Sequence, residues 1–262
     1  MTMSLSLFSQ LSECIRKFGP NQSLDGSLPD DLKLGSDGPI TTVYAPFDHI
    51  PNDARLVVVG ITPGKVQAEN ALRAAGGALR NGKSDHEASR IAKLTASFSG
   101  TQTRNNLVAM LEAIGLASAL GIPSCEELFD PARELIHFTS ALRYPVFVNG
   151  KNYNGSPHML RTPLLRRMVE TYLTEEVAAL PRALWLPLGP KPAIALRHLV
   201  NLGALDPSRL LDGMPHPSGL NGERVAAFLG KIGPQGASIK THPEILVAAR
   251  EALRGRLAET FA

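Results

Sequence analysis

Apolar residues along the chain form two patterns, short continuous runs and sets with helical spacing. The runs at 56–60, 134–140 and 183–188 are short and are followed by a turn or loop, which is typical of buried strands. Between them, segment 104–119 carries apolar residues at helical spacing: Leu107, Met110, Leu111, Ile114 and Leu116. Strands that alternate with helices in this way predict an α/β fold, a three-layer sandwich whose central sheet is mostly parallel with helices on both faces.

The remaining segments follow the same logic. Further helices are predicted at 4–18, 65–80, 191–201, 223–230 and 243–260, and a long one begins at Thr162-Pro163, with Thr as N-cap and Pro in the first turn. Segment 20–54 is rich in Gly, Pro, Asp and Ser and is predicted to be irregular, with room for a short strand at 41–44. Polar loops are predicted at 81–89 and 145–160. We expect one domain over 1–262, with an irregular N-terminal extension at about 1–54.

Composition narrows the function only slightly. An apolar content of 44% and a charged content of 19% are ordinary for a globular protein, and no apolar run approaches the ~20 residues that span a membrane. The N-terminus lacks the pattern of a signal peptide, so we expect a cytoplasmic protein, nucleoid-associated if bacterial. A net charge of +3 allows a polyanionic partner without requiring one. Cys14 and Cys125 are too few for an iron–sulfur cluster or a cysteine-based zinc site, and reduced thiols are expected.

Two short motifs carry most of the chemistry. The first, Gly60-Ile61-Thr62-Pro63-Gly64, follows the run Leu56–Val59 directly, where an open α/β sheet builds ligand sites. The second, His216-Pro217-Ser218-Gly219-Leu220-Asn221, is a loop that offers an imidazole, a hydroxyl and an apolar tip. Taken singly, the first motif is better explained as an ordinary strand-to-helix turn, and the second is also compatible with a surface loop.

Together, the two motifs make the stretch from about 55 to 230 resemble the uracil-DNA glycosylase superfamily. The likeness extends to Ser97-Phe98-Ser99-Gly100 with the helix that follows it, to 138–143, and to 184–189, in the same order. It implies an enzyme that flips a nucleotide out of DNA and cleaves its N-glycosidic bond. It also implies DNA as partner, a monomer, and no metal or cofactor.

The resemblance also implies roles for individual residues. His216 would donate a hydrogen bond to the departing base, and Thr62 would position the water. Phe98 would stack on the base, Ser140 would contact its edge, and Leu220 would wedge into the duplex. The backbone around the base would come from Gly60, Ile61, Pro63 and Gly64, and the contacts to DNA from Lys65, Pro217, Ser218, Gly219 and Asn221.

Three positions depart from the family's pattern. Thr62 stands where active members carry Asp, Glu or Asn, and a hydroxyl cannot serve as a general base near neutral pH. General-base help is worth about 10²–10⁴-fold, so slow catalysis is expected. Ser140 replaces an Asn, and Gly64 replaces the bulky aromatic of strict uracil enzymes. Either the base is not uracil, or base chemistry has been given up.

Two other functions therefore stay open: a non-catalytic module that captures a flipped base or damaged DNA end, and a small-molecule hydrolase that needs no wedge at Leu220. His158 is a second candidate base, although a surface His is the simpler interpretation. Asp85-His86-Glu87 is expected to be solvated, His137 to lie in the core, and Glu69 to be a solvated helix residue rather than to face the pocket. Phosphate contacts and an ordinary basic surface are equally compatible with the cations Arg161, Arg166, Arg167 and Lys191.

Overall fold

The computed structural model describes residues 6–24, 30–96, 101–130, 134–238 and 240–261. The chain divides into two compact units, each assembled from separate stretches of sequence. Unit 1 comprises Met1–Ile50, Ile61–Ser97 and Thr139–Glu176, and unit 2 comprises Pro51–Gly60, Phe98–Phe138 and Val177–Ala262. Within the described residues, no helix is both long enough and apolar enough to cross a membrane.

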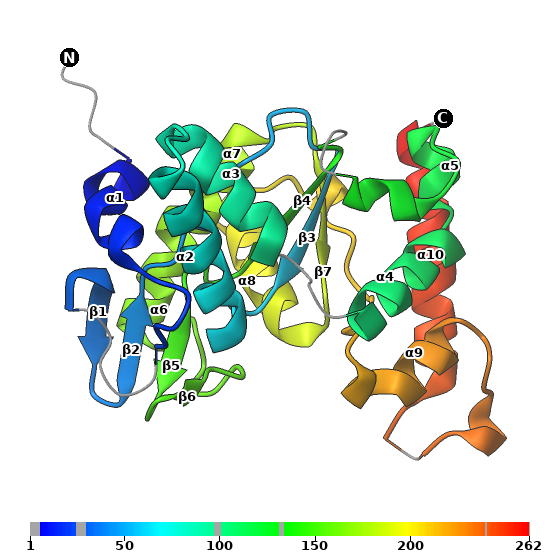
Figure 1. Cartoon of the computed structure of the whole chain (residues 1–262). Coiled ribbons are helices and arrows are strands. Elements are labelled where there is room, and N and C mark those ends of the chain that lie inside the picture. The colour runs from blue at the N-terminus through cyan, green and yellow to red at the C-terminus, as the bar shows by residue number, and fades with distance from the viewer. Residues whose placement is uncertain (1–5, 25–29, 97–100, 131–133, 239, 262) are drawn as a thin grey trace. The chain divides into compact units, whose positions relative to one another are not determined.

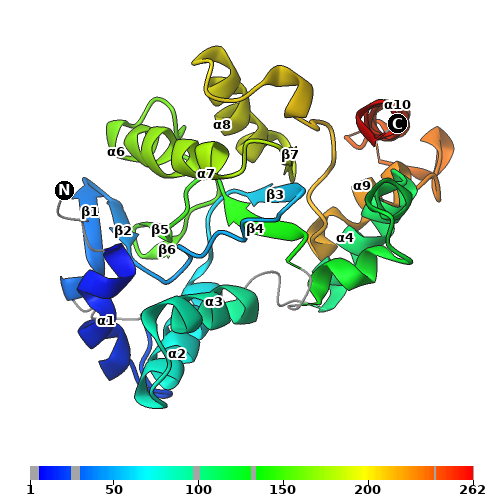
Figure 2. The same cartoon turned by 90° about the horizontal axis from the view of Figure 1, so that it is seen from above.

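Unit 1 is built on an antiparallel sheet. Its strands lie in the order β1 (Lys33–Asp37), β2 (Ile40–Val43), β5 (Val146–Val148) and β6 (Lys151–Asn152). Helix α2 (Lys65–Arg80) packs along α3 (Asp85–Ala96) and against α1 (Leu7–Lys17), as Figure 2 shows. Helix α6 (Pro163–Met168) continues through a π-helical turn, Val169–Leu173, into α7 (Thr174–Ala179).

Unit 2 contains a parallel three-stranded sheet in the order β4 (Ile136–Ser140), β3 (Leu56–Gly60) and β7 (Leu184–Pro187). Strands β3 and β7 pair in register from Leu56 opposite Leu184 to Val59 opposite Pro187. The helices of this unit are α4 (Thr101–Ala113), α5 (Leu116–Leu120), α8 (Pro190–Asn201), α9 (Gly222–Phe228) and α10 (Pro243–Phe261) (Figure 1).

Alternating strand residues form the core of unit 2. Leu56 and Val58 of β3 and Leu184 and Leu186 of β7 point to one face, because side chains alternate along a strand. There they join buried residues of α4, α5, α9 and α10, among them Leu107, Met110, Leu116, Phe228 and Leu253. Helix α8 packs against β7, and its buried residues are not part of this cluster. The sheet thus has helices on both sides, which confirms the predicted α/β class in this coarse form.

Most of the predicted elements are confirmed. The strands at 56–60, 134–140 and 183–188 are β3, β4 and β7, and the helices at 65–80, 191–201, 223–230 and 243–260 are α2, α8, α9 and α10. The helix at 4–18 is α1, and the one that begins after Thr162 has Pro163 in its first turn, as predicted.

Four local predictions were wrong. Segment 81–89 is not a loop throughout, because α3 begins at Asp85. The helix predicted at 104–119 is broken at Gly115, whose φ of 80° is left-handed, into α4 and α5. The stretch 20–54 contains the β1–β2 hairpin, and segment 145–160 contains the β5–β6 hairpin. Strand β2 nevertheless confirms the short strand predicted at 41–44. The other three strands were missed because each is short, and β1 and β6 are also polar and exposed.

Candidate functional site

The first motif forms the turn that leads from β3 to α2. Thr62 is half-buried, and its hydroxyl donates a hydrogen bond of 3.1 Å to the backbone carbonyl of Tyr144. The amide of Leu142 donates to the carbonyl of Ile61 at 3.0 Å, so residues that follow β4 hold the turn at two points. Because the hydroxyl proton of Thr62 is bonded to Tyr144, its oxygen can only accept a further hydrogen bond. Thr62 can therefore hold a water molecule but cannot act as its base near neutral pH.

Gly64 is the N-cap of α2. The side chain of Asn152, a residue that the sequence analysis did not predict for the site, lies beside it. The Gly64 amide donates to Oε1 of Gln67 at 2.9 Å, and the Lys65 amide donates to Oδ1 of Asn152 at 2.9 Å. A Cβ atom on Gly64 would lie 3.4 Å from Nδ2 of Asn152. Asn152 could have been found from the Asn149-Gly150 dipeptide, which is a strong signal for a two-residue hairpin turn.

Lys65, predicted to contact DNA, has a carboxylate neighbour on its own helix. Its ammonium lies 3.7 Å from Glu69, and Glu69 also accepts hydrogen bonds from the Ser23 hydroxyl at 2.8 Å and the Leu24 amide at 2.9 Å. Burial alone would raise the pKa of Glu69, but these donors, Lys65 and Arg73 together hold it below its ordinary value. Glu69 is buried, so the prediction of a solvated residue was wrong. Its carboxylate instead connects the N-terminal segment, through Ser23 and Leu24, to α2.

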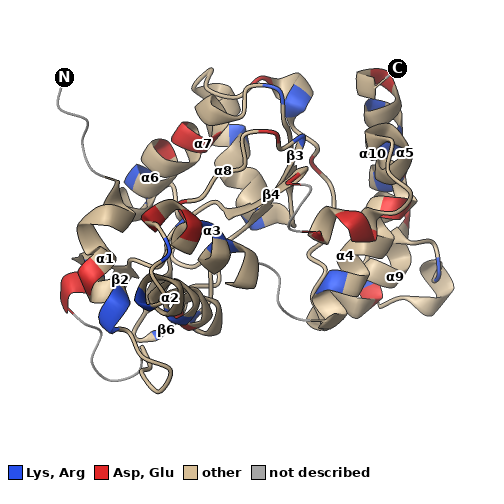
Figure 3. Cartoon of the chain, turned by 45° about the horizontal axis from the view of Figure 1, so that its top comes forward, with Lys and Arg blue, Asp and Glu red and all other residues tan. Residues whose placement is uncertain are grey.

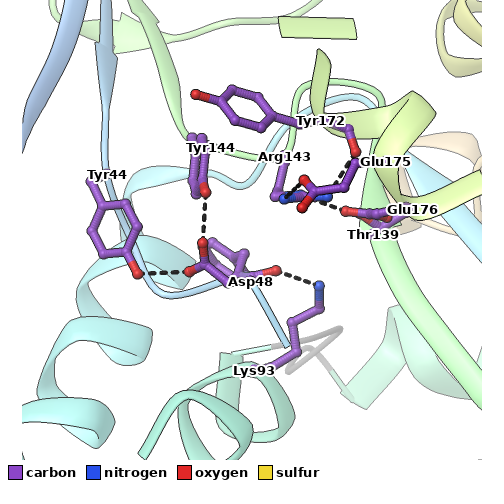
Figure 4. A network of polar contacts seen from close by, with 10 residues as sticks. Tyr44, Asp48, Lys93, Thr139, Arg143, Tyr144, Tyr172, Glu175 and Glu176 are labelled. Atoms are coloured by element: carbon purple, nitrogen blue, oxygen red, sulfur yellow. Dashed lines mark hydrogen bonds and ion pairs between the residues drawn. The ribbon is translucent and has the colours of Figure 1, made fainter. Parts of the chain in front are cut away.

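Ser140 is the last residue of β4 and is half-buried. The segment that follows is held by Arg143, whose guanidinium is buried and bonds Glu176 at 2.6 Å, Glu175 at 2.8 Å and the Tyr172 carbonyl at 2.7 Å (Figure 4). Burial alone would lower the pKa of Arg143, but Glu176 and its neighbours raise it, so the guanidinium stays charged. Ser140 is thus carried on a strand end that a buried ion pair fixes.

A second part of the same polar network surrounds Asp48. Its two carboxylate oxygens accept hydrogen bonds of 2.6 Å from the hydroxyls of Tyr44 and Tyr144 (Figure 4). Nearby, the buried Lys93 donates to the Phe47 carbonyl at 2.7 Å, and burial lowers the pKa of Lys93 to about 8. Tyr144 joins this network to the first motif, because its carbonyl accepts the proton of Thr62.

The second motif contains a histidine whose protonation is defined by its own loop. The Ser218 amide donates to Nδ1 of His216 at 3.2 Å, so Nδ1 must be the unprotonated nitrogen. Burial lowers the pKa of His216, which favours the neutral ring. A neutral imidazole with an acceptor at Nδ1 carries its proton on Nε2, and Nε2 is therefore a hydrogen-bond donor.

Side chains of α4, none of them predicted from the sequence, hold this loop within unit 2. Nδ2 of Asn106 donates to the Pro217 carbonyl at 2.8 Å, and Gln102 lies close enough to Gly219 that a Cβ there would be 2.7 Å from Oε1. Asn221 donates to the Ser218 hydroxyl at 3.0 Å. Leu220 stands at the tip of the loop and is fully exposed. Residues of α4 thus hold the backbone of a loop whose tip presents an exposed leucine.

A comparison with known proteins identifies the group to which the chain belongs. Over 231 residues it is 32% identical to the uncharacterized protein YoxB of Bacillus subtilis (strain 168), an alignment that covers 87% of this chain and 90% of that protein. The chain belongs to the YoxB family. No family model matches it, and no solved structure does.

In this YoxB-family chain the predicted site residues fall on both units. Ile61, Thr62, Pro63, Gly64, Lys65 and Ser140 belong to unit 1, and Gly60 and the motif from His216 to Asn221 belong to unit 2. Phe98 lies outside the described residues. Lysines and arginines are interspersed with acidic residues along the helices (Figure 3), and Arg166 bonds Glu170 at 2.7 Å.

Four other histidines of the YoxB-family chain lie away from the two motifs in sequence. Nδ1 of His158 accepts a hydrogen bond of 3.3 Å from the Leu160 amide, and His137 is buried in β4, as predicted. His86, predicted to lie on a solvated loop, is in α3, and its ring contacts that of His49 at 5.7 Å beside a pocket of about 380 Å³. Among the described residues, no group of three or more His, Cys, Asp or Glu side chains is arranged to hold a metal ion.

Proposed function

We propose that the chain is a DNA glycosylase with a three-layer fold of the uracil-DNA glycosylase type. It would flip a deaminated or otherwise altered base out of DNA and hydrolyse the bond that joins the base to the sugar. Water adds to the sugar carbon, the carbon–nitrogen bond breaks, and its electrons leave with the base, which then takes up a proton. DNA is the proposed partner of a monomeric enzyme.

The observation that carries this proposal is the hydrogen bond that the Ser218 amide donates to Nδ1 of His216. The base departs with negative charge, and a donor aimed at that charge lowers the barrier, commonly by about 10²–10³-fold. Because the Ser218 amide occupies Nδ1, the proton of His216 is on Nε2 and can be donated to an oxygen of the base. Leu220, fully exposed on the same loop, would fill the space that the flipped nucleotide leaves.

Thr62 would hold the attacking water through its hydroxyl oxygen. Since the Thr62 proton is bonded to the Tyr144 carbonyl, the water must donate to Thr62 and keeps one proton and its lone pairs for the reaction. This orients the water without deprotonating it. We therefore expect cleavage to be slower, by up to the ~10²–10⁴-fold that a general base contributes, than in an enzyme that has such a base.

The test is a single-turnover assay at high enzyme concentration. Its substrates are oligonucleotides that carry uracil, hypoxanthine, xanthine or mismatched thymine, and abasic sites are revealed by alkaline cleavage. His216→Ala is compared with His158→Ala as a matched control. In both histidines Nδ1 accepts a hydrogen bond from the backbone amide of the residue two positions later in the chain. Cleavage that only His216→Ala abolishes supports the proposal; loss in His158→Ala alone would transfer the chemistry to that loop.

The wedge can be tested separately with Leu220→Ala on duplex DNA and on the free nucleoside. We expect cleavage of the duplex to fall while folding is unchanged, because the side chain contacts solvent only. Unchanged cleavage of the duplex would show that Leu220 is not a wedge. Activity on the nucleoside alone would instead favour a small-molecule hydrolase.

A second candidate is a reader that captures a flipped base without cleaving it. The bond from Thr62 to Tyr144 favours it, because this residue supplies no base for the water. The same assay separates the two functions: the reader binds modified DNA but leaves every substrate intact.

A further inference from the structure

We propose that the side-chain amide of Asn152 selects the base, and that it favours bases presenting a carbonyl oxygen where the undamaged base has an amino group. The inference rests on the proposed glycosylase function, because it concerns how that site chooses its substrate. Deamination makes this exchange: it converts the amino groups of cytosine, adenine and guanine into carbonyls. The substrate class is therefore the deaminated bases.

The β5–β6 hairpin places Asn152 at the first motif. Asn149 and Gly150 have positive φ angles of 49° and 73°, as a tight two-residue turn requires. The turn pairs Asn152 with Phe147, whose side chain is buried, and so fixes the position of Asn152. From there Asn152 reaches the N-terminus of α2, where it bonds Lys65.

That bond also fixes which end of the amide faces outward. A backbone N–H can only donate, so the atom of Asn152 that lies 2.9 Å from the Lys65 nitrogen must be its oxygen. Its Nδ2 group, with two N–H donors, then lies over Gly64, 3.4 Å from where a Cβ would be. Asn152 is exposed, and its Nδ2 donates to no other residue that the structure describes.

The neighbouring polar groups of the turn are already bonded. Gln67 accepts from the Gly64 amide and donates to the Ala96 carbonyl at 3.4 Å, and the proton of Thr62 goes to Tyr144. The outward end of the Asn152 amide thus carries only donors, and the Thr62 hydroxyl of the same turn can only accept. A carbonyl oxygen satisfies such a donor, whereas an amino group would set N–H against N–H and leave both unpaired, which disfavours binding. Because Gly64 has no side chain, Nδ2 of Asn152 can lie this close to the turn.

The experiment removes the outward N–H donors of Asn152 and keeps the oxygen that accepts from the Lys65 amide. In Asn152→Asp an oxygen still accepts from the Lys65 amide, but the outward N–H₂ becomes an oxygen. Asn154→Asp is the matched control, since it adds the same charge two residues away at another exposed position. The parent and both variants are assayed under single turnover on oligonucleotides with uracil, hypoxanthine or xanthine, and their thermal unfolding is compared.

We expect Asn152→Asp to cleave its deaminated substrate at least about tenfold more slowly, the value of one hydrogen bond, and Asn154→Asp to match the parent. If the parent cleaves and Asn152→Asp cleaves equally well, the inference is wrong and the glycosylase function stands. If the parent cleaves none of the substrates, the proposed function fails, and the inference fails with it. Equal loss in both variants would assign the effect to charge and would also overturn the role of Asn152.

Discussion

Replacing Glu176 by Gln tests whether the polar network behind the first motif stabilises the fold. The Glu176 side chain is fully buried, and one of its oxygens lies 2.6 Å from Nε of Arg143 and 3.0 Å from the Thr139 hydroxyl. The substitution keeps the shape and one carbonyl oxygen but removes the negative charge. Arg143, itself only 5% exposed, then keeps Glu175 as its remaining carboxylate partner.

The magnitude follows from burial. A buried charge that loses its partner costs about 3–5 kcal/mol, because solvent cannot replace the lost carboxylate. Glu175 is the matched control, since it bonds the same guanidinium at 2.8 Å but its side chain is 61% exposed. An exposed partner contributes about 0–1 kcal/mol. We therefore expect Glu176→Gln to lower the free energy of unfolding by about 3 kcal/mol, and Glu175→Gln by less than about 1 kcal/mol.

The assay is equilibrium unfolding in urea at neutral pH, followed by circular dichroism, with the slope of each transition compared to confirm that the same surface is exposed. The reasoning is refuted if the two variants lose equal stability, or if Glu176→Gln loses less than Glu175→Gln. Either result would mean that the Tyr172 carbonyl, rather than Glu176, compensates the charge of Arg143.

Four further predictions address the rest of the molecule. Gly76→Ala should lower the free energy of unfolding in urea by about 1–3 kcal/mol, because the new Cβ would lie 2.6 Å from a backbone carbonyl of α1. Gly77→Ala is the control: a Cβ there meets open space, so the free energy of unfolding should rise by up to about 1 kcal/mol. The pKa of Lys93 is lowered to about 8 in the folded state, so above that pH the unfolded state binds more protons than the folded state. The free energy of unfolding of the parent should therefore rise, relative to that of Lys93→Met, by up to about 3 kcal/mol as the pH approaches 10. Because burial lowers the pKa of His216, a pH profile of cleavage should stay level down to about 6.5, the ordinary histidine value. It should fall only below that pH, where a proton on Nδ1 would break the hydrogen bond from the Ser218 amide. Thr62→Asp should speed single-turnover cleavage by up to about 10²-fold if the missing base limits the rate; no increase would show that it does not.

The elements that could be predicted are those whose burial is visible along the chain itself. Strand β3 is an unbroken apolar run, and α2 and α8 begin at Gly and Pro signals, so local sequence sufficed. Strands β1 and β6 are polar and exposed, and each pairs with its neighbour across a tight turn, β1 with β2 and β6 with β5. Both turns had a local signal, the dipeptides Asp37-Gly38 and Asn149-Gly150.

For the candidate site, the sequence supplied the residue types but not their hydrogen bonds. It could indicate that Thr62 is not a base, yet its bond to Tyr144 depends on a residue more than eighty positions away. Asn106 and Gln102 could not be predicted for the same reason. In the sequence of α4 they are ordinary polar residues, and only the structure shows that they contact the second motif. Long-range partners of polar side chains leave no periodic pattern, whereas buried apolar faces do.

The hydrogen bonds of the two motifs suggest where a glycosylase of this kind would obtain its rate. At the first motif the proton of Thr62 is bonded to Tyr144, and the outward end of the Asn152 amide carries only donors, so neither side chain can remove a proton from water. At the second, the Ser218 amide keeps the proton of His216 on Nε2, where it can meet charge on the base. Catalysis would then depend on stabilising the departing base rather than on activating the water. Such a mechanism favours bases that already leave easily as anions, and deaminated bases with their carbonyl oxygens spread that charge better than the amino-bearing bases from which they derive.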